Sequence, residues 1–323
     1  MSSKEIIFYL DGKEFKQSSD GFVPFDESVM DRGRAIFDAI EFYDGVFIFI
    51  DPHLERTYNA SKILGASIKG IFSKEEFKNK LNDLKPIILR HFDKNILLKI
   101  EIIVSKQSNI FLRVVPISRE WLDTKLRLTF VAVQYKYLLQ SLKYCGRYAE
   151  PMIITELAQQ QIDSKIEECL FYSKSEKKSM VLEASNSAFF VIDTKNRLWG
   201  AETPDVLSST TSKIIKEIAK QDMQDSSVPK KEKISAVMPT GFPINIYGYE
   251  VKEMFSTSYA RLLPVVEKLI FADIKNNKSG ITVRRTRGIK DIIVRETPIT
   301  DRLRTRFQNE VKRYIETEKN KNK

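Results

Sequence analysis

The way strand pairs and helices are interspersed along this chain most constrains its fold. Residues 6–10 form an apolar run that ends at Asp11-Gly12, and residues 36–43 are joined to residues 46–50 by Asp44-Gly45. An Asp-Gly pair flanked by such runs is typical of a β-hairpin. Helical segments follow these hairpins without a regular β-α-β alternation. The sequence therefore predicts an α+β protein and not a doubly wound parallel sheet.

Several helix boundaries can be predicted from capping signals. Asp51 is expected as an N-cap with Pro52 at the first helical position, and Ser73 opens a capping box with Glu76. Near the C-terminus, Leu303, Phe307, Val311 and Ile315 recur at helical spacing, and Thr300 is the expected N-cap.

The chain has 323 residues, enough for two domains. The pattern of strands and helices breaks at residues 118–125. We therefore expect a small N-terminal domain with hairpins and helices at residues 1–120 and a larger mixed domain at residues 126–323.

Composition excludes several classes of protein. No apolar run approaches the roughly 20 residues needed to cross a bilayer, and no export signal is recognisable, so we expect a cytoplasmic protein without a membrane partner. Cys145 and Cys169, with His53 and His91, lack the spacing of metal ligands, so no metal is predicted.

The net charge of +10 is concentrated at one end of the chain. Residues 284–323 hold 13 Lys or Arg against 6 Asp or Glu. Because this segment also has a helical apolar stripe, we interpret it as a packed helix with a solvated basic face, and a nucleic-acid partner is not expected.

No glycine-rich phosphate loop and no nucleophile elbow is present. Instead, a series of short motifs follows in a fixed order. They are Gly33-Arg34-Ala35-Ile36-Phe37-Asp38, His53-Leu54-Glu55-Arg56, Lys143-Tyr144-Cys145-Gly146-Arg147-Tyr148-Ala149, Val181-Leu182-Glu183-Ala184-Ser185, Leu207-Ser208-Ser209-Thr210-Thr211, Phe255-Ser256-Thr257-Ser258 and Ile299-Thr300-Asp301-Arg302-Leu303.

In this order and spacing, the series resembles the class IV, or fold-type IV, aminotransferases that use pyridoxal 5'-phosphate. This family includes branched-chain aminotransferases, D-amino-acid aminotransferases and aminodeoxychorismate lyases. The resemblance implies the two-domain α+β fold of that family and a homodimer. It also implies transfer of an amino group from a branched-chain-like amino acid to a 2-oxo acid through a lysine Schiff base.

The resemblance also implies roles for single residues. Lys143 is the implied Schiff-base lysine, since an amine can condense with the cofactor aldehyde once its pKa is lowered. Glu183 would pair with the pyridine nitrogen and Tyr148 with the ring hydroxyl, while Leu207 would lie under the ring. The implied phosphate ligands are Arg56, Thr210, Thr211 and Ser258.

The sequence departs from the family pattern at positions that bear on activity. Ala188 and Ser209 stand where the family usually has Asn and Gly, and Lys99 lies where branched-chain enzymes bind the substrate carboxylate. Two alternatives therefore stay open. One is a carbon–carbon lyase of the aminodeoxychorismate type, and the other is a non-catalytic member with a basic binding surface.

Overall fold

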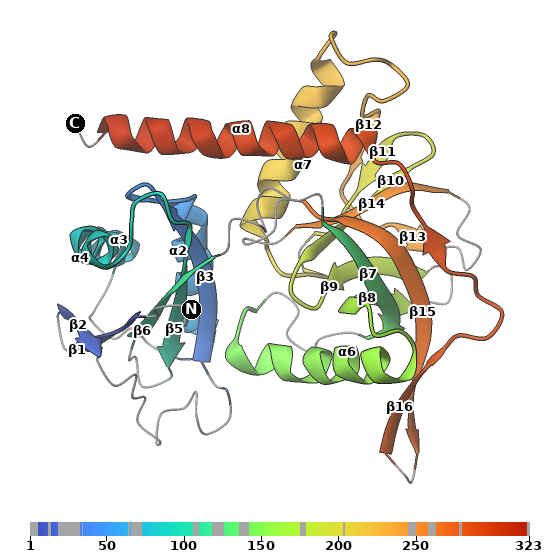
Figure 1. The fold of residues 1–323 in the computed structure, drawn as a ribbon, viewed down its shortest axis with the longest axis horizontal. Coiled ribbons are helices and arrows are strands. Elements are labelled where there is room, and N and C mark those ends of the chain that lie inside the picture. Colours follow the sequence, from blue (N-terminus) through green and yellow to red (C-terminus); the bar gives the residue numbers. More distant parts are fainter. Residues whose placement is uncertain are drawn as a thin grey trace. The chain divides into compact units, whose positions relative to one another are not determined.

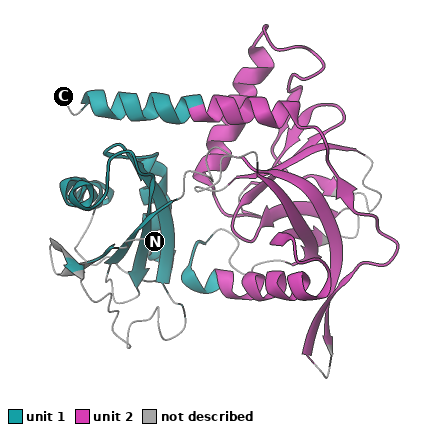
Figure 2. Cartoon of the chain, viewed as in Figure 1, with its two compact units in different colours: residues 1–123, 142–147, 309–323 teal, residues 124–141, 148–308 magenta. Residues whose placement is uncertain are grey.

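The protein divides into two compact units (Figure 2). Unit 1 comprises Met1–Asp123, Leu142–Arg147 and Asn309–Lys323, and unit 2 comprises Thr124–Ser141 and Tyr148–Gln308. The computed structural model describes residues 6–11, 14–18, 33, 35–63, 65, 73–105, 110–117, 126–135, 142–174, 179–202, 204–244, 250–257, 263–277 and 280–321. The segment at 118–125, predicted as the linker, lies outside these residues. Within them, no helix is long and apolar enough to span a membrane.

Unit 1 is built on a six-stranded antiparallel sheet in the order β2-β1-β6-β5-β3-β4 (Figure 1). Its strands are β1 (Ile6–Asp11), β2 (Glu14–Ser18), β3 (Ala35–Tyr43), β4 (Val46–Phe47), β5 (Leu98–Ser105) and β6 (Ile110–Pro116). Both predicted hairpins are present, as β1–β2 and β3–β4.

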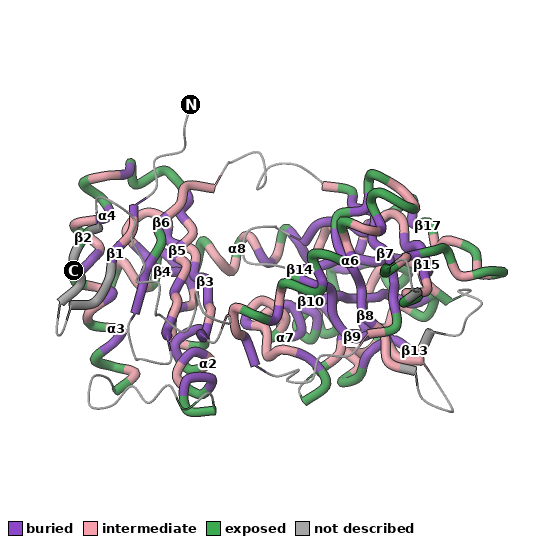
Figure 3. The backbone as a smooth tube through the Cα atoms, turned by 90° about the horizontal axis from the view of Figure 1, so that it is seen from below, coloured by how far each residue is buried: buried purple, intermediate pink, exposed green. Residues whose placement is uncertain are grey.

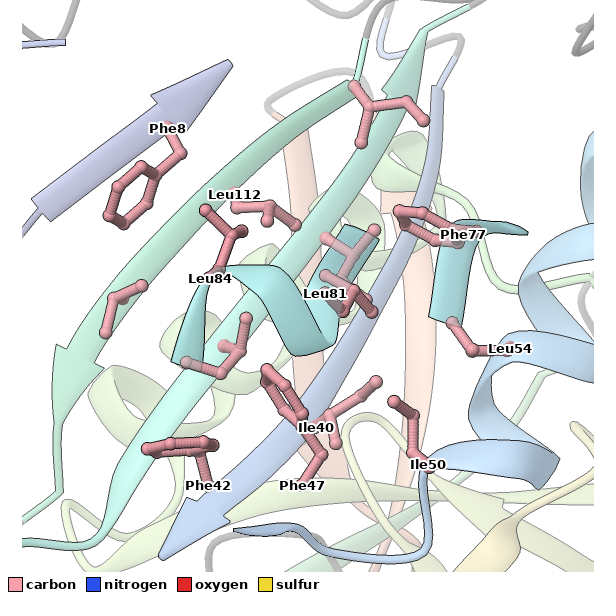
Figure 4. Close-up of a cluster of buried hydrophobic side chains, with 14 of the residues drawn as sticks. Phe8, Ile40, Phe42, Phe47, Ile50, Leu54, Phe77, Leu81, Leu84 and Leu112 are labelled. Carbon is pink, nitrogen blue, oxygen red and sulfur yellow. The ribbon is translucent and has the colours of Figure 1, made fainter. Parts of the chain in front are cut away.

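One face of this sheet is covered by α2 (Ile50–Ile63), α3 (Lys74–Asp83) and α4 (Lys85–His91) (Figure 4). Ile36, Ile40 and Phe42 share one face of β3 and are almost fully buried in one cluster with Leu54 and Leu81 of these helices. The sheet thus has one apolar face, as period-two alternation requires.

The second hairpin is shorter than predicted, and α2 begins earlier. The strand ends at Phe47, because Phe49 adopts the left-handed conformation with φ 50° and extended pairing cannot continue through it. Helix α2 begins at Ile50, so Asp51 lies in its first turn instead of capping it, and there it accepts a bond from Lys78 Nζ at 2.9 Å. Ser73 is confirmed as the N-cap of α3, since its hydroxyl accepts from Glu76 N at 3.2 Å.

Unit 2 contains an eleven-stranded mixed sheet. At its centre β7 pairs in parallel with both β15 and β8, and β7 is buried along nearly its whole length (Figure 3). The strands are β7 (Arg127–Gln134), β8 (Ile166–Lys174), β9 (Ser179–Ala184), β10 (Ala188–Asp193), β11 (Arg197–Trp199), β12 (Ala236–Met238), β13 (Pro243–Ile244), β14 (Val251–Thr257), β15 (Val265–Asn277), β16 (Gly280–Arg285) and β17 (Ile292–Ile293).

The other helical segments of the described residues are the 3-10 turn η1 (Cys145–Tyr148), α6 (Ala149–Gln161), α7 (Thr210–Gln224) and α8 (Pro298–Lys321). Helix α6 packs on β8 and β16. Residues of α8 up to Gln308 belong to unit 2, and those from Asn309 onward belong to unit 1. Helix α8 begins two residues before the predicted cap Thr300, which instead donates both its N–H and its hydroxyl to Glu253 Oε2 of β14 at 2.7 Å.

Candidate active site

The buried carboxylate of Asp38 brings several polar side chains of unit 1 together. Asp38 lies on β3 between Ile36 and Ile40, on the face that α2 covers, and it is fully buried. Helix α2 presents His53, Arg56 and Thr57 to it at spacings of three and four residues, which places them on one helical face. Arg56 donates from Nε to Oδ2 at 2.9 Å and from Nη2 to Oδ1 at 2.5 Å, so the ion pair is bidentate.

Lys143 reaches the same carboxylate because its segment runs along the open edge of β3. Phe37 N donates to the Lys143 carbonyl at 3.2 Å, and Ile36 forms an antiparallel bridge with Tyr144. The Lys143 amine then lies 3.4 Å from Asp38 Oδ1 and 5.2 Å from the centre of the Phe37 ring. The lysine is 9% exposed.

A pair of glycines permits this close approach. Gly33 has φ +64°, which favours glycine, and Gly146 N donates to its carbonyl at 3.1 Å. A side chain at position 33 would place its Cβ only 3.1 Å from Gly146 Cα. The glycine of the Lys143 motif therefore has a local packing role.

Burial lowers the pKa of the Lys143 amine from 10.5 to about 8. The Asp38 charge opposes this shift, whereas the neighbouring guanidinium groups of Arg56 and Arg147 reinforce it. At neutral pH the uncharged, nucleophilic amine is therefore far more populated than in an ordinary lysine.

Asp38 itself remains ionised. Burial alone would raise its pKa, but Arg56, Lys143 and His53 together hold the pKa of this carboxyl well below its usual range. Burial also lowers the pKa of His53, more than its bond with Asp38 raises it, so the imidazole is neutral at pH 7. Its Nδ1 lies 3.1 Å from Asp38 Oδ1 and 3.2 Å from Arg56 Nη2.

In unit 2 the predicted residues Glu183 and Leu207 come together. Glu183 lies at the end of β9 and is 7% exposed, and its Oε2 accepts a hydrogen bond from Leu207 N at 3.3 Å. Ala188, one of the departures from the family pattern, is the strand partner of Glu183 where β10 meets β9. The carboxylate is thus oriented by the backbone of the next motif.

The threonine motif opens α7. The helix begins at Thr210, and Ser209 is its N-cap, since its hydroxyl accepts from Ser212 N at 3.2 Å. The unpartnered N–H groups of a first helical turn attract anions. Beside this turn lies a cavity of about 190 Å³, whose lining includes Leu207, Ser208, Ser209, Ser212, Lys213 and Lys216. Lys216 is already engaged there with Glu202 Oε1 at 2.6 Å.

Tyr148 and Ser258 are the two remaining predicted site residues. Tyr148 is the half-buried N-cap residue of α6 and makes no side-chain capping bond. Ser258 lies outside the described residues. Sequence reasoning missed the roles of Asp38 and His53, although a charged residue at a core-facing position between Ile36 and Ile40 was a usable signal. It also missed Lys213, four residues after the Ser209 cap.

The family model described as Amino-transferase class IV matches residues 35–236, more than half of the sequence. The chain therefore belongs to the class IV aminotransferase family. No curated protein matches it significantly.

Solved structures share the fold at low sequence identity. The fold-IV transaminase CpuTA1 from Curtobacterium pusillum is 13% identical with a TM-score of 0.69, over 94% of this chain and 98% of that one. A hypothetical aminotransferase from Mycobacterium tuberculosis in its apo form is 14% identical with a TM-score of 0.68, over 94% and 96% of the two chains. The fold is thus that of a fold-type IV transaminase, as the sequence predicted.

Proposed function

We propose that this protein is an aminotransferase that uses pyridoxal 5'-phosphate, attached to Lys143, to move an amino group from an amino acid to a 2-oxo acid. The observation that carries the proposal is the buried Lys143 amine with its pKa of about 8. Such an amine can attack an aldehyde near neutral pH, which an exposed lysine does far less readily. A branched-chain-like substrate, a homodimer and a cytoplasmic location remain predictions.

The residues present in each unit fit this cofactor. Unit 1 offers the nucleophilic amine and the guanidinium of Arg56. Unit 2 offers Glu183 for a pyridinium nitrogen and the first turn of α7, with Thr210 and Thr211, for a phosphate. We also propose Tyr148 for the ring hydroxyl, Leu207 for the ring face and Ser258 for the phosphate, as the family resemblance implies.

When bound, pyridoxal phosphate supplies an electron sink for the negative charge that develops at the substrate α-carbon. Lys143 Nζ would hold the cofactor and then carry the proton to and from that carbon as a general base and acid. Glu183, held by the Leu207 N–H, would keep the ring nitrogen protonated. Arg56 would contribute charge to phosphate binding from a position fixed by Asp38.

Reduction with borohydride after incubation with pyridoxal phosphate, followed by peptide mass spectrometry, tests the attachment. The label is expected on the peptide that contains Lys143 and is expected to be lost in Lys143→Ala. Lys220→Met is the matched control, because Lys220 is an exposed helical lysine paired only locally with Glu217. Label on another lysine, or none, would refute the proposal.

The reaction product distinguishes the aminotransferase from the alternative carbon–carbon lyase. Release of pyruvate from aminodeoxychorismate would indicate the lyase, and amino transfer to 2-oxoglutarate would indicate the aminotransferase. The buried amine serves both reactions, so the structure favours neither over the other.

The non-catalytic alternative depends on the departures at Ala188, Ser209 and Lys99 and on the basic C-terminal segment. In the structure several cations of α8 are paired: Arg302 binds Asp222 bidentately at 2.8 and 3.0 Å, Arg306 binds Asp225, and Lys319 binds Asp44. These pairs offset much of the local positive charge, which weakens the case for a nucleic-acid surface.

A further inference from the structure

Two residues with different proposed tasks converge on one carboxylate in unit 1. Arg56 is proposed for the phosphate and Lys143 for the aldehyde, and both contact Asp38. Neither contact was expected from the sequence. An anion shared by two cations attracts both and favours their charged forms.

We propose that Asp38 is a positioning residue, which holds the Arg56 guanidinium firmly and the Lys143 amine loosely, so that the amine is poised to leave the carboxylate and react. This inference rests on the proposed function of Lys143. It concerns how the protein prepares that amine before any cofactor is bound.

The hydrogen bonds to the two oxygens of Asp38 indicate that the carboxylate binds Arg56 more tightly than Lys143. Asp38 Oδ2 accepts hydrogen bonds from Arg56 Nε at 2.9 Å and from Thr57 Oγ1 at 3.2 Å. Asp38 Oδ1 accepts from Arg56 Nη2 at 2.5 Å and from Ala39 N at 2.7 Å, and His53 Nδ1 lies 3.1 Å from it. A carboxylate offers about four lone-pair positions. Lys143, at 3.4 Å from Oδ1, is therefore the most distant of several groups around a crowded oxygen.

Arg56 and Lys143 differ in how tightly their side chains can hold the Asp38 carboxylate. The Arg56 fork matches the carboxylate geometry bidentately, whereas an ammonium group is a point charge that can turn away by rotation of its side chain. Loss of the lysine contact therefore leaves Asp38 still satisfied by Arg56 and Thr57. The amine can depart without stranding a buried charge, which a nucleophilic group requires.

The same carboxylate also limits how readily the amine loses its proton. The charged groups that face Lys143 are Asp38 from β3, Arg56 from α2 and Arg147 from its own segment, with the neutral His53 beside them. Asp38 is the anion that favours the ammonium form in this set. Its removal would leave the positive charges of Arg56 and Arg147 unopposed among the described groups that shift the pKa of Lys143, so the amine should become uncharged at lower pH.

The test is competitive acetylation of the full-length chain without cofactor, with acetic anhydride at a series of pH values and the Lys143 peptide quantified by mass spectrometry. The wild type is expected to show a labelling midpoint near pH 8. In Asp38→Asn the midpoint should fall by half a unit or more, which raises labelling at pH 7 about threefold. In Asp38→Glu, which keeps the charge, the midpoint should return toward that of the wild type.

Asp44→Asn is the matched control. Asp44 lies on the hairpin turn after the same strand, pairs with Lys319 and has φ 51°, which Asn tolerates. Its Lys143 midpoint should equal that of the wild type. A residue that only supported the fold would lower thermal stability without moving the midpoint, so an unchanged midpoint in folded Asp38→Asn would overturn the proposal.

Arg56→Gln provides a second arm in case Asp38→Asn does not fold. Without the guanidinium, a positive charge that disfavours the ammonium form is lost while Asp38 remains, so the midpoint should rise above that of the wild type. If the Lys143 labelling midpoint of Arg56→Gln were equal to or below that of the wild type, the proposal that Arg56 and Lys143 share the Asp38 carboxylate would be refuted. No cofactor is present in these measurements, so they test the role of Asp38 even if pyridoxal phosphate does not attach to Lys143. Failure of the Asp38 proposal can therefore be distinguished from failure of the proposed function.

Discussion

At the scale of the residue, the candidate chemistry depends on how burial and charge oppose each other around Lys143. Burial favours the neutral amine and Asp38 favours the ammonium form, and the balance places the pKa at about 8. His53 stays neutral beside them, so it fills space and offers a hydrogen bond without adding a further positive charge.

This balance predicts how attachment of pyridoxal phosphate depends on pH. Because the folded pKa of Lys143 is lowered to about 8, the reactive neutral amine accumulates as the pH rises toward 8 and levels off above it. The rate constant for attachment should therefore increase about tenfold per pH unit between pH 6 and 7 and become flat above about pH 9. Stopped-flow absorbance of the bound cofactor measures it. A rate that still rises steeply from pH 9 to 10 would indicate an ordinary solvated lysine.

Substitution of Glu183 should reduce turnover without preventing attachment of the cofactor. Glu183→Gln keeps the size and an oxygen for the Leu207 N–H but removes the charge proposed to hold the pyridinium proton. Amino transfer should fall by about a hundredfold, roughly 3 kcal/mol of transition-state stabilisation, while borohydride still labels Lys143. Steady-state kinetics and peptide mapping measure the two effects. Full activity in the variant would exclude the proposed role.

At the scale of the element, local signals predicted the existence of helices better than their boundaries. The Ser73 cap was predicted correctly because its partner, Glu76 N, lies only three residues away. The start of α8 was predicted at Thr300, but its first turn is capped by Glu253, which is 47 residues away in sequence. No local pattern contains that partner. The approach of Asp38 and Lys143, 105 residues apart, was hidden for the same reason.

The Glu253 cap predicts a large loss of stability on truncation. Its oxygens accept from Ile299 N at 3.1 Å and from both donors of Thr300 at 2.7 Å, and the side chain is fully buried. Glu253→Ala should strand these donors and lower the free energy of unfolding by about 2–4 kcal/mol. Denaturant titration measures it, with the exposed Glu250→Ala as the control. Equal midpoints for the two variants would show that the cap contributes nothing.

At the scale of the whole molecule, the family motifs predicted the fold although identity to the compared structures is only 13–14%. The motifs carry that information because they fix where the chain turns and which strands carry polar groups. The motifs could not predict which of the two compact units each distant segment of the chain belongs to. Leu142–Arg147 and Asn309–Lys323 belong to unit 1 because of edge pairing with β3 and apolar contacts that composition does not reveal.

The end of α8 therefore has a structural role that can be tested. Ile315 is 8% exposed and packs in a cluster with Val46, Ile48 and Leu97 of unit 1. Ile315→Ala should lower the stability of unit 1 by about 2–4 kcal/mol through lost burial and a residual cavity. The exposed Lys312→Ala on the same helix should cost less than about 0.5 kcal/mol. Hydrogen exchange of the β3 and β5 amides reports on unit 1 separately from unit 2. Faster exchange there in Ile315→Ala alone is the expected result, and identical exchange in both variants would mean that this segment is a detached basic tail after all.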